Sequence, residues 1–248
     1  ELAPRRVFVG DAGAIPYFSG RPSLDGLGLG GFRAMPFAKA SVLGEGAVVE
    51  LIERLPASER PDTLAIYESW WPDLSWTFGE RQFSVLLEDN VICGAPEKTV
   101  YRADWSLLED RRSEAERSID RIDFGDLIDE ELHKARFFPR EPRVGFDVHQ
   151  RKEGRSFDGV RRLEAGQWLQ FELATEGEPR VLELQLGPSN EFAFSVERGS
   201  LVEQFAGGSE ADEWLTLTTA TPNPSSTVTL RVHSGLLKLG AARLLPAQ

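Results

Sequence analysis

Two adjacent tryptophans flanked by carboxylates are the residues of this sequence whose chemistry is easiest to interpret. Trp70 and Trp71 lie in the segment Glu68-Ser69-Trp70-Trp71-Pro72-Asp73. An exposed indole ring stacks on the apolar face of a sugar, and carboxylates beside it accept hydrogen bonds from the sugar's hydroxyl groups. The alternative interpretation is that both indoles fill a hydrophobic core.

A glycine-rich stretch between Gly10 and Gly31 carries the second group of candidates, Asp11 and Asp25. Carboxylates in such loops either bind a cation through oxygen or accept hydrogen bonds from backbone N–H groups in tight turns. A dinucleotide-binding fingerprint is excluded because Arg33 occupies the position of a required glycine, and the sequence has no Gly-Lys-Ser/Thr of a P-loop. We therefore expect neither a nucleotide nor any other cofactor, and no metal ion.

Other catalytic chemistry lacks a recognisable motif. His133, His149 and His233 are far apart in the sequence and stand in no metal-binding frame, and there is no Gly-x-Ser-x-Gly elbow. Cys93, the single cysteine, fits a small core residue better than a nucleophile. The 40 acidic residues supply too many carboxylate pairs to indicate a glycosidase. No catalytic residue is assigned, although a hydrolase site built from distant residues stays open.

Composition and charge narrow the classes of partner. Hydrophobic residues make up 41% of the 248 residues, which is enough for one or two cores, and the net charge is −12. A chain this acidic is repelled by nucleic-acid phosphates and by anionic membrane surfaces, so we expect no nucleic-acid partner. No apolar run reaches the length of about 18 residues that indicates a membrane span, and residues 1–6 do not resemble a signal peptide.

The secondary structure predicted around these candidates differs between the first and second parts of the chain. Residues 1–140 are predicted to form a small α/β domain, with a helix at 45–55 that ends before Pro56. Asp126 is a plausible N-cap for a helix that continues to about Arg136, in a charged segment at 109–137. Strands are predicted at 5–9, 63–67, 82–93 and 98–105. The acidic residues Asp123, Asp126, Asp129 and Glu130 are expected on a solvated helix face.

From residue 143 onward the hydrophobic pattern has a period of two. In WLQFEL, Leu169, Phe171 and Leu173 alternate with polar residues, and VLELQL and TVTLRVH repeat the pattern. Such strands, separated by Gly, Pro, Asn and Ser, predict an antiparallel β-sandwich over residues 143–248, similar in pattern to jelly-roll and carbohydrate-binding modules. The fold class is therefore α+β, an α/β domain followed by a sandwich. Trp168 is expected on the face opposite Leu169, which favours its exposure.

Three segments resemble a known group of enzymes in the same order. They are Val9–Gly20 with Asp25–Leu29, then Val100–Trp105, then Ile119–Leu127. These segments resemble the region after the last membrane helix of GT-C class glycosyltransferases, the polytopic membrane enzymes that use lipid-phosphate sugars, including mannosyl- and arabinosyltransferases. The resemblance covers roughly residues 7–137.

The resemblance implies a function for the candidate residues. The chain would be an extracytoplasmic, periplasmic or cell-surface, domain of a bacterial transferase, and its partners would be the membrane-embedded part of that protein and a glycan or lipid-linked sugar acceptor. In such enzymes the catalytic carboxylate lies between membrane helices, so we expect this chain not to be catalytic alone. The residues expected to contact the ligand are Asp11, Tyr17, Asp25, Trp70, Trp71 and Trp168. A free-standing carbohydrate-binding protein and a glycan or ester hydrolase are the alternatives.

Overall fold

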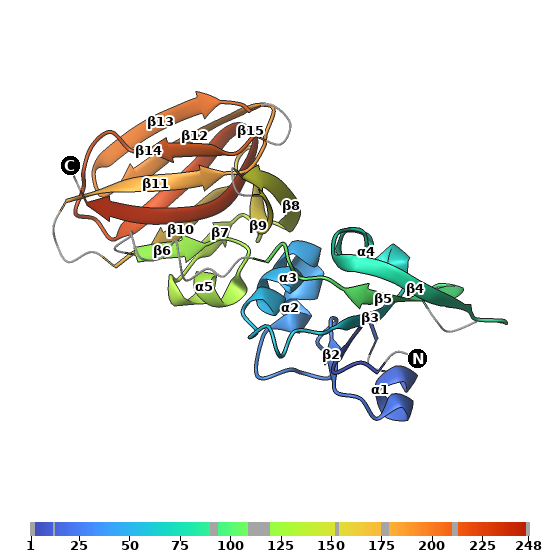
Figure 1. Ribbon diagram of the computed structural model, residues 1–248. Helices are drawn as coiled ribbons and strands as arrows, with labels where there is room; N and C mark the ends of the chain where they lie inside the picture. The colour runs from blue at the N-terminus through green and yellow to red at the C-terminus, as the bar shows by residue number, and fades with distance from the viewer. Residues whose placement is uncertain are drawn as a thin grey trace. The chain divides into compact units, whose positions relative to one another are not determined.

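The computed structural model of the chain divides it into two compact units, Glu1–Leu108 and Glu109–Gln248 (Figure 1). It describes residues 3–11, 13–89, 94–108, 120–151, 154–174, 179–209 and 213–246, so Cys93 lies outside the described residues. The first unit is a small α/β domain and the second an antiparallel β-sandwich, which confirms the predicted fold class. In the described part of the chain, no helix combines the length and apolar character of a membrane span.

The first unit is built on one mixed sheet with the strand order β2-β1-β3-β5-β4. Strand β1 pairs in parallel with β2 on one side and β3 on the other, whereas β5 is antiparallel to both β3 and β4. The predicted strands near residues 5–9, 63–67 and 98–105 are confirmed as β1, β3 and β5. The bounds are β1 Val7–Val9, β2 Ser23–Asp25, β3 Thr63–Ile66, β4 Gly79–Leu86 and β5 Glu97–Ala103.

Short helices connect these strands. The helix predicted at 45–55 is confirmed as α3 (Glu45–Glu53), whose apolar residues Val48, Leu51 and Ile52 are fully buried. The sequence prediction missed the other helices because they are short and irregular in hydrophobic period. They are α1 (Ala14–Ser19), α2 (Phe37–Leu43), the 3₁₀ helix η1 (Glu68–Trp70) and α4 (Pro72–Phe78).

In the second unit the strand β15 joins two antiparallel sheets. Its first half pairs with β10 and β12, and its second half pairs with β6, β9 and β11. Strands β13 and β7 complete the first sheet, and β8 and β14 complete the second. The bounds are β6 Asp120–Asp123, β7 Arg136–Phe138, β8 Val144–Arg151, β9 Gly154–Glu164, β10 Trp168–Glu172, β11 Arg180–Leu186, β12 Phe192–Arg198, β13 Leu201–Gly207, β14 Leu215–Thr218 and β15 Thr227–Pro246.

The alternation seen in the sequence sets the core of the sandwich. Leu169 and Phe171 of β10 point inward with Leu184 of β11 and Leu230 of β15, and all are at most 1% exposed. At roughly 25 cal/mol for each Å² of apolar surface removed from water, such side chains supply most of the driving force for packing the two sheets. The apolar residues that recur at every second position in the sequence are therefore the buried residues of these strands.

The boundary between the units lies earlier than predicted. Residues 109–140 were assigned to the α/β domain, with the sandwich beginning at 143. In the structure β6 pairs with β15 and β7 pairs with β10, so this stretch of chain belongs to the second unit from Glu109 onward. Both strands are only three or four residues long and flank a charged helix, which is why no period of two identified them.

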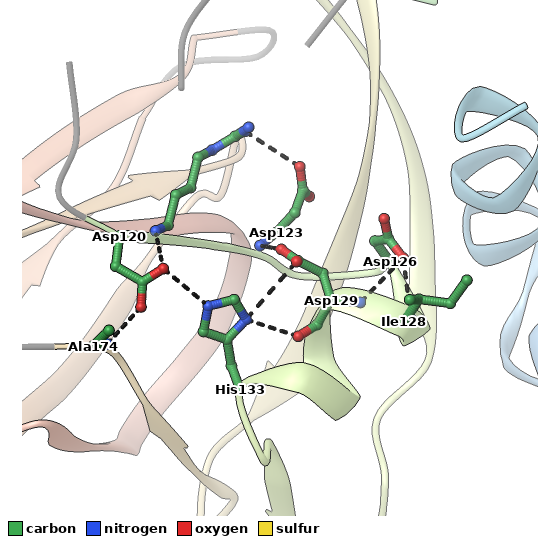
Figure 2. A network of polar contacts seen from close by, with 8 residues as sticks. Asp120, Asp123, Asp126, Ile128, Asp129, His133 and Ala174 are labelled. Atoms are coloured by element: carbon green, nitrogen blue, oxygen red, sulfur yellow. Dashed lines mark hydrogen bonds and ion pairs between the residues drawn. The ribbon is translucent and has the colours of Figure 1, made fainter. Parts of the chain in front are cut away.

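The acidic segment around α5 (Leu127–Leu132) is buried, not solvated as predicted. Asp126 caps α5 as predicted, since its carboxylate accepts hydrogen bonds from the backbone N–H groups of Ile128 and Asp129 (Figure 2). Asp123, Asp126 and Glu130 are at most 5% exposed. The helix ends at Leu132, short of Arg136, because the chain turns into β7. These carboxylates are buried because each has a polar partner in the fold.

A buried ion pair connects α5 to β9. The guanidinium of Arg161 is fully buried and contacts both carboxylate oxygens of Glu130, while its Nη1 donates to the carbonyl of Pro142 at 2.6 Å. Glu141 provides a second carboxylate at 2.9 Å. Burial alone would lower the pKa of Arg161, but the charges and hydrogen bonds of Glu130 and Glu141 outweigh it and raise the pKa.

Removal of Glu130 should destabilise the second unit strongly. We expect Glu130→Ala to lower its free energy of unfolding by about 3–5 kcal/mol, because Arg161 keeps a buried charge with one partner fewer. The control is Glu172→Ala, which removes an exposed ion pair: the side chain of Lys134 is 62% exposed and that of Glu172 46%. This loss should lower the free energy of unfolding by less than about 1 kcal/mol. Urea denaturation followed by circular dichroism measures both. Equal losses in the two variants would contradict the importance of the buried pair.

Candidate functional site

The strand order of the first unit reverses between β1 and β3. The chain leaves β1 toward β2 on one side and then returns to place β3 on the other side of β1. In open α/β sheets, ligands bind outside the carboxyl ends of the strands at such a reversal. The segments that follow β1 and β3 meet at this point, where the antiparallel β5 begins. We call this group the switch-point site: Gly10, Asp11, Tyr67, Trp70, Trp71 and Lys98.

A charged pair occupies one side of the switch-point site. The Nζ of Lys98 donates to Oδ1 of Asp11 and lies 4.6 Å from the centre of the Tyr67 ring. The Lys98 side chain is 13% exposed and that of Asp11 is 37% exposed, so the carboxylate is the more accessible partner. Ion pairing and the aromatic face hold the ammonium in place. The pair thus places a hydrogen-bond acceptor, the Asp11 carboxylate, beside a hydrogen-bond donor, the Lys98 ammonium group.

The two adjacent tryptophans have different environments. Trp70 is 41% exposed, and its ring centre lies 5.2 Å from that of Tyr67. A Cβ atom added to Gly94 would lie 1.9 Å from Cζ2 of Trp70, so only glycine fits beneath this indole. Trp70 therefore has the exposure that a recognition residue requires, and its contact with a ligand stays a prediction.

Trp71 belongs to the core, as the alternative interpretation held. It is 3% exposed and meets Phe8 edge to face, with ring centres 5.1 Å apart. Its Nε1 has no hydrogen-bond partner among the described residues, and a Cβ on Gly10 would lie 2.6 Å from that nitrogen. A buried N–H without a partner costs about 1–3 kcal/mol. The structure tolerates this cost at the switch-point site, next to Asp11.

The other two candidates of this unit have separate roles. Asp25 is 6% exposed, and its carboxylate accepts hydrogen bonds from the backbone N–H groups of Leu27 at 3.0 Å and Gly30 at 2.9 Å. It therefore closes the glycine loop, which leaves it little capacity for a ligand. Tyr17 is 82% exposed and packs edge to face against Phe18, at 5.0 Å between ring centres. A ligand contact for Tyr17 stays a prediction.

The sequence analysis did not single out three further residues of the first unit. Lys98 was not a candidate because lysines are common and its partner Asp11 is distant in the sequence. Phe18 and Trp76 are 81% and 90% exposed, yet aromatic residues are usually assigned to cores. Only the strand order could have identified Lys98, since it brings the start of β5 to the carboxyl end of β3.

Trp168 lies in the second unit and is half-buried. The Phe138 ring stacks against it at 5.5 Å with an angle of 24° between planes, and the Arg231 guanidinium lies 5.3 Å from its ring centre. Trp168 does point away from Leu169, as predicted, but its neighbours cover it. The open indole face expected from the sequence is therefore absent.

His133 is held in a polar network with carboxylates (Figure 2). Its Nδ1 lies 2.8 Å from the carbonyl oxygen of Asp129 and its Nε2 lies 3.3 Å from Oδ1 of Asp120. The other oxygen of Asp120 accepts from the backbone N–H of Ala174 at 2.5 Å. Burial raises the pKa of Asp129, and the charge of Asp123 adds to this. Among the described residues no hydroxyl or thiol contacts His133, so the network holds β6 and α5 in place.

A second histidine comes closer to a hydrolase arrangement. Nε2 of His233 lies 3.0 Å from Oγ of Ser195. Ser195 is only 2% exposed, and no carboxylate of the described chain orients His233. A nucleophile needs access to substrate and a base oriented by a third group. The pair therefore lacks the third member of a catalytic triad, and its serine is not accessible to substrate. The side chain of His149 lies outside the described residues.

The architecture and the switch-point site define an α/β unit of ligand-binding topology that precedes a β-sandwich. Residues 2–126 match the model of a family described as a domain of unknown function, DUF8728. This match spans half of the chain, and the chain belongs to that family. No curated protein matches the chain.

Several solved structures of carbohydrate-binding modules are similar to this chain. The module CBM6cm-2 of Cellvibrio mixtus lichenase 5A, in complex with cellotriose, is 14% identical over 53% of this chain and 99% of that chain, with a TM-score of 0.35. CsCBM6-3 of Clostridium stercorarium, with cellobiose, is 11% identical over 46% and 93%, with a TM-score of 0.30. A β-1,3-glucan-binding CBM6 of Bacillus halodurans is 12% identical over 51% and 95%, with a TM-score of 0.32. With TM-scores this low, the functional argument depends on the chain's own residues.

A half-buried carboxyl group holds the first turn of the helix that follows the tryptophans. Oε2 of Glu45 accepts from the backbone N–H of Leu74 at 2.7 Å and Oε1 from that of Asp73 at 3.4 Å, in the first turn of α4. Burial raises the pKa of Glu45 from 4.5 to about 7, and the charge of Asp73 adds to this, while the two backbone hydrogen bonds oppose it.

The stability of the first unit should therefore depend on pH through Glu45. Because the folded-state pKa is raised, the folded state binds the proton more tightly, and the resulting stabilisation is complete below about pH 4.5 and lost as the pH rises through about 7. We expect the melting temperature to fall by about 5 °C or more across this window, and Glu45→Gln to remove most of the fall. Calorimetry from pH 4.5 to pH 8 measures it. An identical pH profile for the variant would contradict this assignment.

Proposed function

We propose that this chain is the extracytoplasmic part of a membrane glycosyltransferase, that it is not catalytic by itself, and that it binds the glycan acceptor at the switch-point site. The observation that carries glycan binding is the convergence, at the carboxyl ends of β1 and β3, of an exposed indole with fixed hydrogen-bonding groups of both kinds. Topology alone would suggest a ligand here, and the side chains indicate its class.

The chemistry of the site suits a sugar. The exposed part of Trp70, supported by Tyr67 and Gly94, offers an apolar surface to the C–H face of a pyranose ring. Asp11 accepts a hydrogen bond from a hydroxyl group, and Lys98 donates one. Both charged groups already pair with each other, so a neutral hydroxyl can join them without separating an ion pair. A phosphate would gain less, because Asp11 would repel it.

Two observations support the proposal that the chain is part of a membrane glycosyltransferase: the segments that resemble GT-C enzymes, and the exposure of their side chains. The segment Val9–Gly20 runs from the last residue of β1 through α1, and Asp25–Leu29 runs from the last residue of β2 into the loop that follows. Tyr17, Phe18 and Leu29 in these segments are 82%, 81% and 78% exposed. Large apolar side chains exposed together usually contact a partner, and tyrosine is enriched at the membrane interface. A membrane-embedded part of the same protein would cover them.

Loss of the Trp70 ring should weaken glycan binding. We expect Trp70→Ala to weaken binding of the purified chain to its best glycan on an array by about 10-fold or more, since the loss of a central aromatic side chain typically costs about 1–3 kcal/mol. The matched control is Trp76→Ala, because Trp76 is a 90% exposed indole on α4 of the same unit, outside the switch-point site. Isothermal titration calorimetry with the glycan selected on the array gives the affinities.

Two results would reject the proposal. Equal losses in Trp70→Ala and Trp76→Ala, with both variants folded, would reject the switch-point site as the place of binding. Turnover of a glycan or ester by the purified chain would reject its non-catalytic role.

In the full-length transferase, Trp70→Ala should raise the KM for the acceptor and leave the KM for the lipid-linked donor unchanged.

A further inference from the structure

The outer face of the first sheet of the sandwich carries a column of stacked side chains. Glu197 of β12 pairs with Nε of Arg231 at 2.5 Å, and the guanidinium of Arg231 lies over the ring of Trp168. The next ring in the column is that of Phe138 on β7, nearly parallel to Trp168. The four residues come from neighbouring strands in the order β12, β15, β10 and β7.

The column ends in an accessible aromatic ring. Strand β7 is the last strand on its side of this sheet in the described part of the chain. Trp168 covers one face of Phe138, which is nevertheless 54% exposed. The preceding residue Phe137 packs against the core of the unit, so the outward direction of Phe138 is fixed by the alternation of the strand. A large apolar ring is thus held at the sheet edge with its free side toward solvent.

We propose that Phe138 is the stacking platform of a second glycan-binding site, which takes a sugar ring of a neutral oligosaccharide as the next layer of the column. An aromatic ring held by neighbours on one side loses little side-chain entropy on binding. Trp168 and Arg231 position Phe138, and neither needs to move for a ring to stack on it. This site is confined to the second unit and does not rest on the switch-point site.

The ion pairs around the column favour a neutral ligand, whereas Arg136, exposed on the same face of β7 as Phe138, adds a positive charge beside it. Arg231 pairs with Glu197, Lys134 with Glu172, and Arg140 lies 3.7 Å from Glu164. Gln170, on the same face of β10 as Trp168, donates to the hydroxyl of Thr229 at 3.2 Å. Uncharged hydroxyl groups can share such donors and acceptors, whereas an ionised sugar would have to compete with an existing ion pair.

Heteronuclear NMR of the full chain tests this site and the switch-point site separately. The chain has six tryptophans, whose indole N–H signals can be assigned from single Trp→Phe variants. We expect titration with neutral tetrasaccharides (cellotetraose, laminaritetraose and mannotetraose) to shift the Trp168 signal for at least one of them. We expect Phe138→Ala to weaken the affinity read from that signal by about 10-fold or more. Leu132→Ala, a 70% exposed residue on α5 of the same unit, should leave it unchanged.

The possible outcomes are distinct. The proposal is overturned if no neutral tetrasaccharide shifts the Trp168 signal, or if Phe138→Ala keeps the affinity while its other indole signals show an intact fold. A shift produced only by tetragalacturonate would overturn the neutral class of ligand. Shifts of the Trp70 or Trp71 signals report on the proposed function instead, so failure at one site is read independently of the other.

Discussion

The central position of β1 is the constraint on which the first unit depends. This strand has three residues, all buried, and parallel partners on both sides. Its Phe8 side chain is fully buried and meets Trp71 edge to face, which ties β1 to the chain that follows β3. A Cβ on Gly26 would lie 2.2 Å from Phe8, and one on Gly10 would lie 2.6 Å from Trp71. Two glycines after parallel strands therefore allow two large rings to close the carboxyl end of the sheet.

The same packing explains how one sequence segment supplies both a core residue and an exposed indole. Because Trp71 enters the core and η1 turns the chain just before it, Trp70 is directed outward over Gly94. Glu45 then accepts the first backbone N–H groups of α4, so the helix begins directly after the pair. The question of whether the tryptophans are core or surface has a different answer for each, and the answer is set by these local contacts.

In the sandwich, the pattern of burial was predictable and the polar contacts were not. Alternation identified strands such as β10, β11 and the first half of β15, since inward residues had to be apolar on every second position. The pairing of β6 and β7 with distant strands left no local trace, so the boundary near 140 was wrong. Glu130 and its partner Arg161 are 31 residues apart, and charged residues are rarely buried unless paired. A single sequence shows the charges but not the pairing.

The same distinction applies to the candidate site, where residue types could be read from the sequence and contacts between distant residues could not. Asp11, Trp70 and Trp71 were found by residue type, and the strand order brought them together with Lys98, which no motif marks. For Asp25 the sequence could not decide, because an acidic residue in a glycine loop looks the same whether it binds a ligand or accepts hydrogen bonds from its own loop, as Asp25 does here. Trp168 pointed to the right face of its strand, but its neighbours Phe138 and Arg231 come from strands 30 and 63 residues away in sequence, and they cover it.

The two aromatic sites proposed above predict that binding depends on the length of the glycan. A sugar stacked on one exposed ring gains a few kcal/mol at most, which by itself gives weak binding. The two proposed sites are carried on two linked units, so for a glycan long enough to reach both, the second contact would be intramolecular and the apparent affinity would rise. A short oligosaccharide fills one site only and gains nothing from the linkage. Under the proposed function, such an arrangement would favour an extended acceptor polymer over its free fragments.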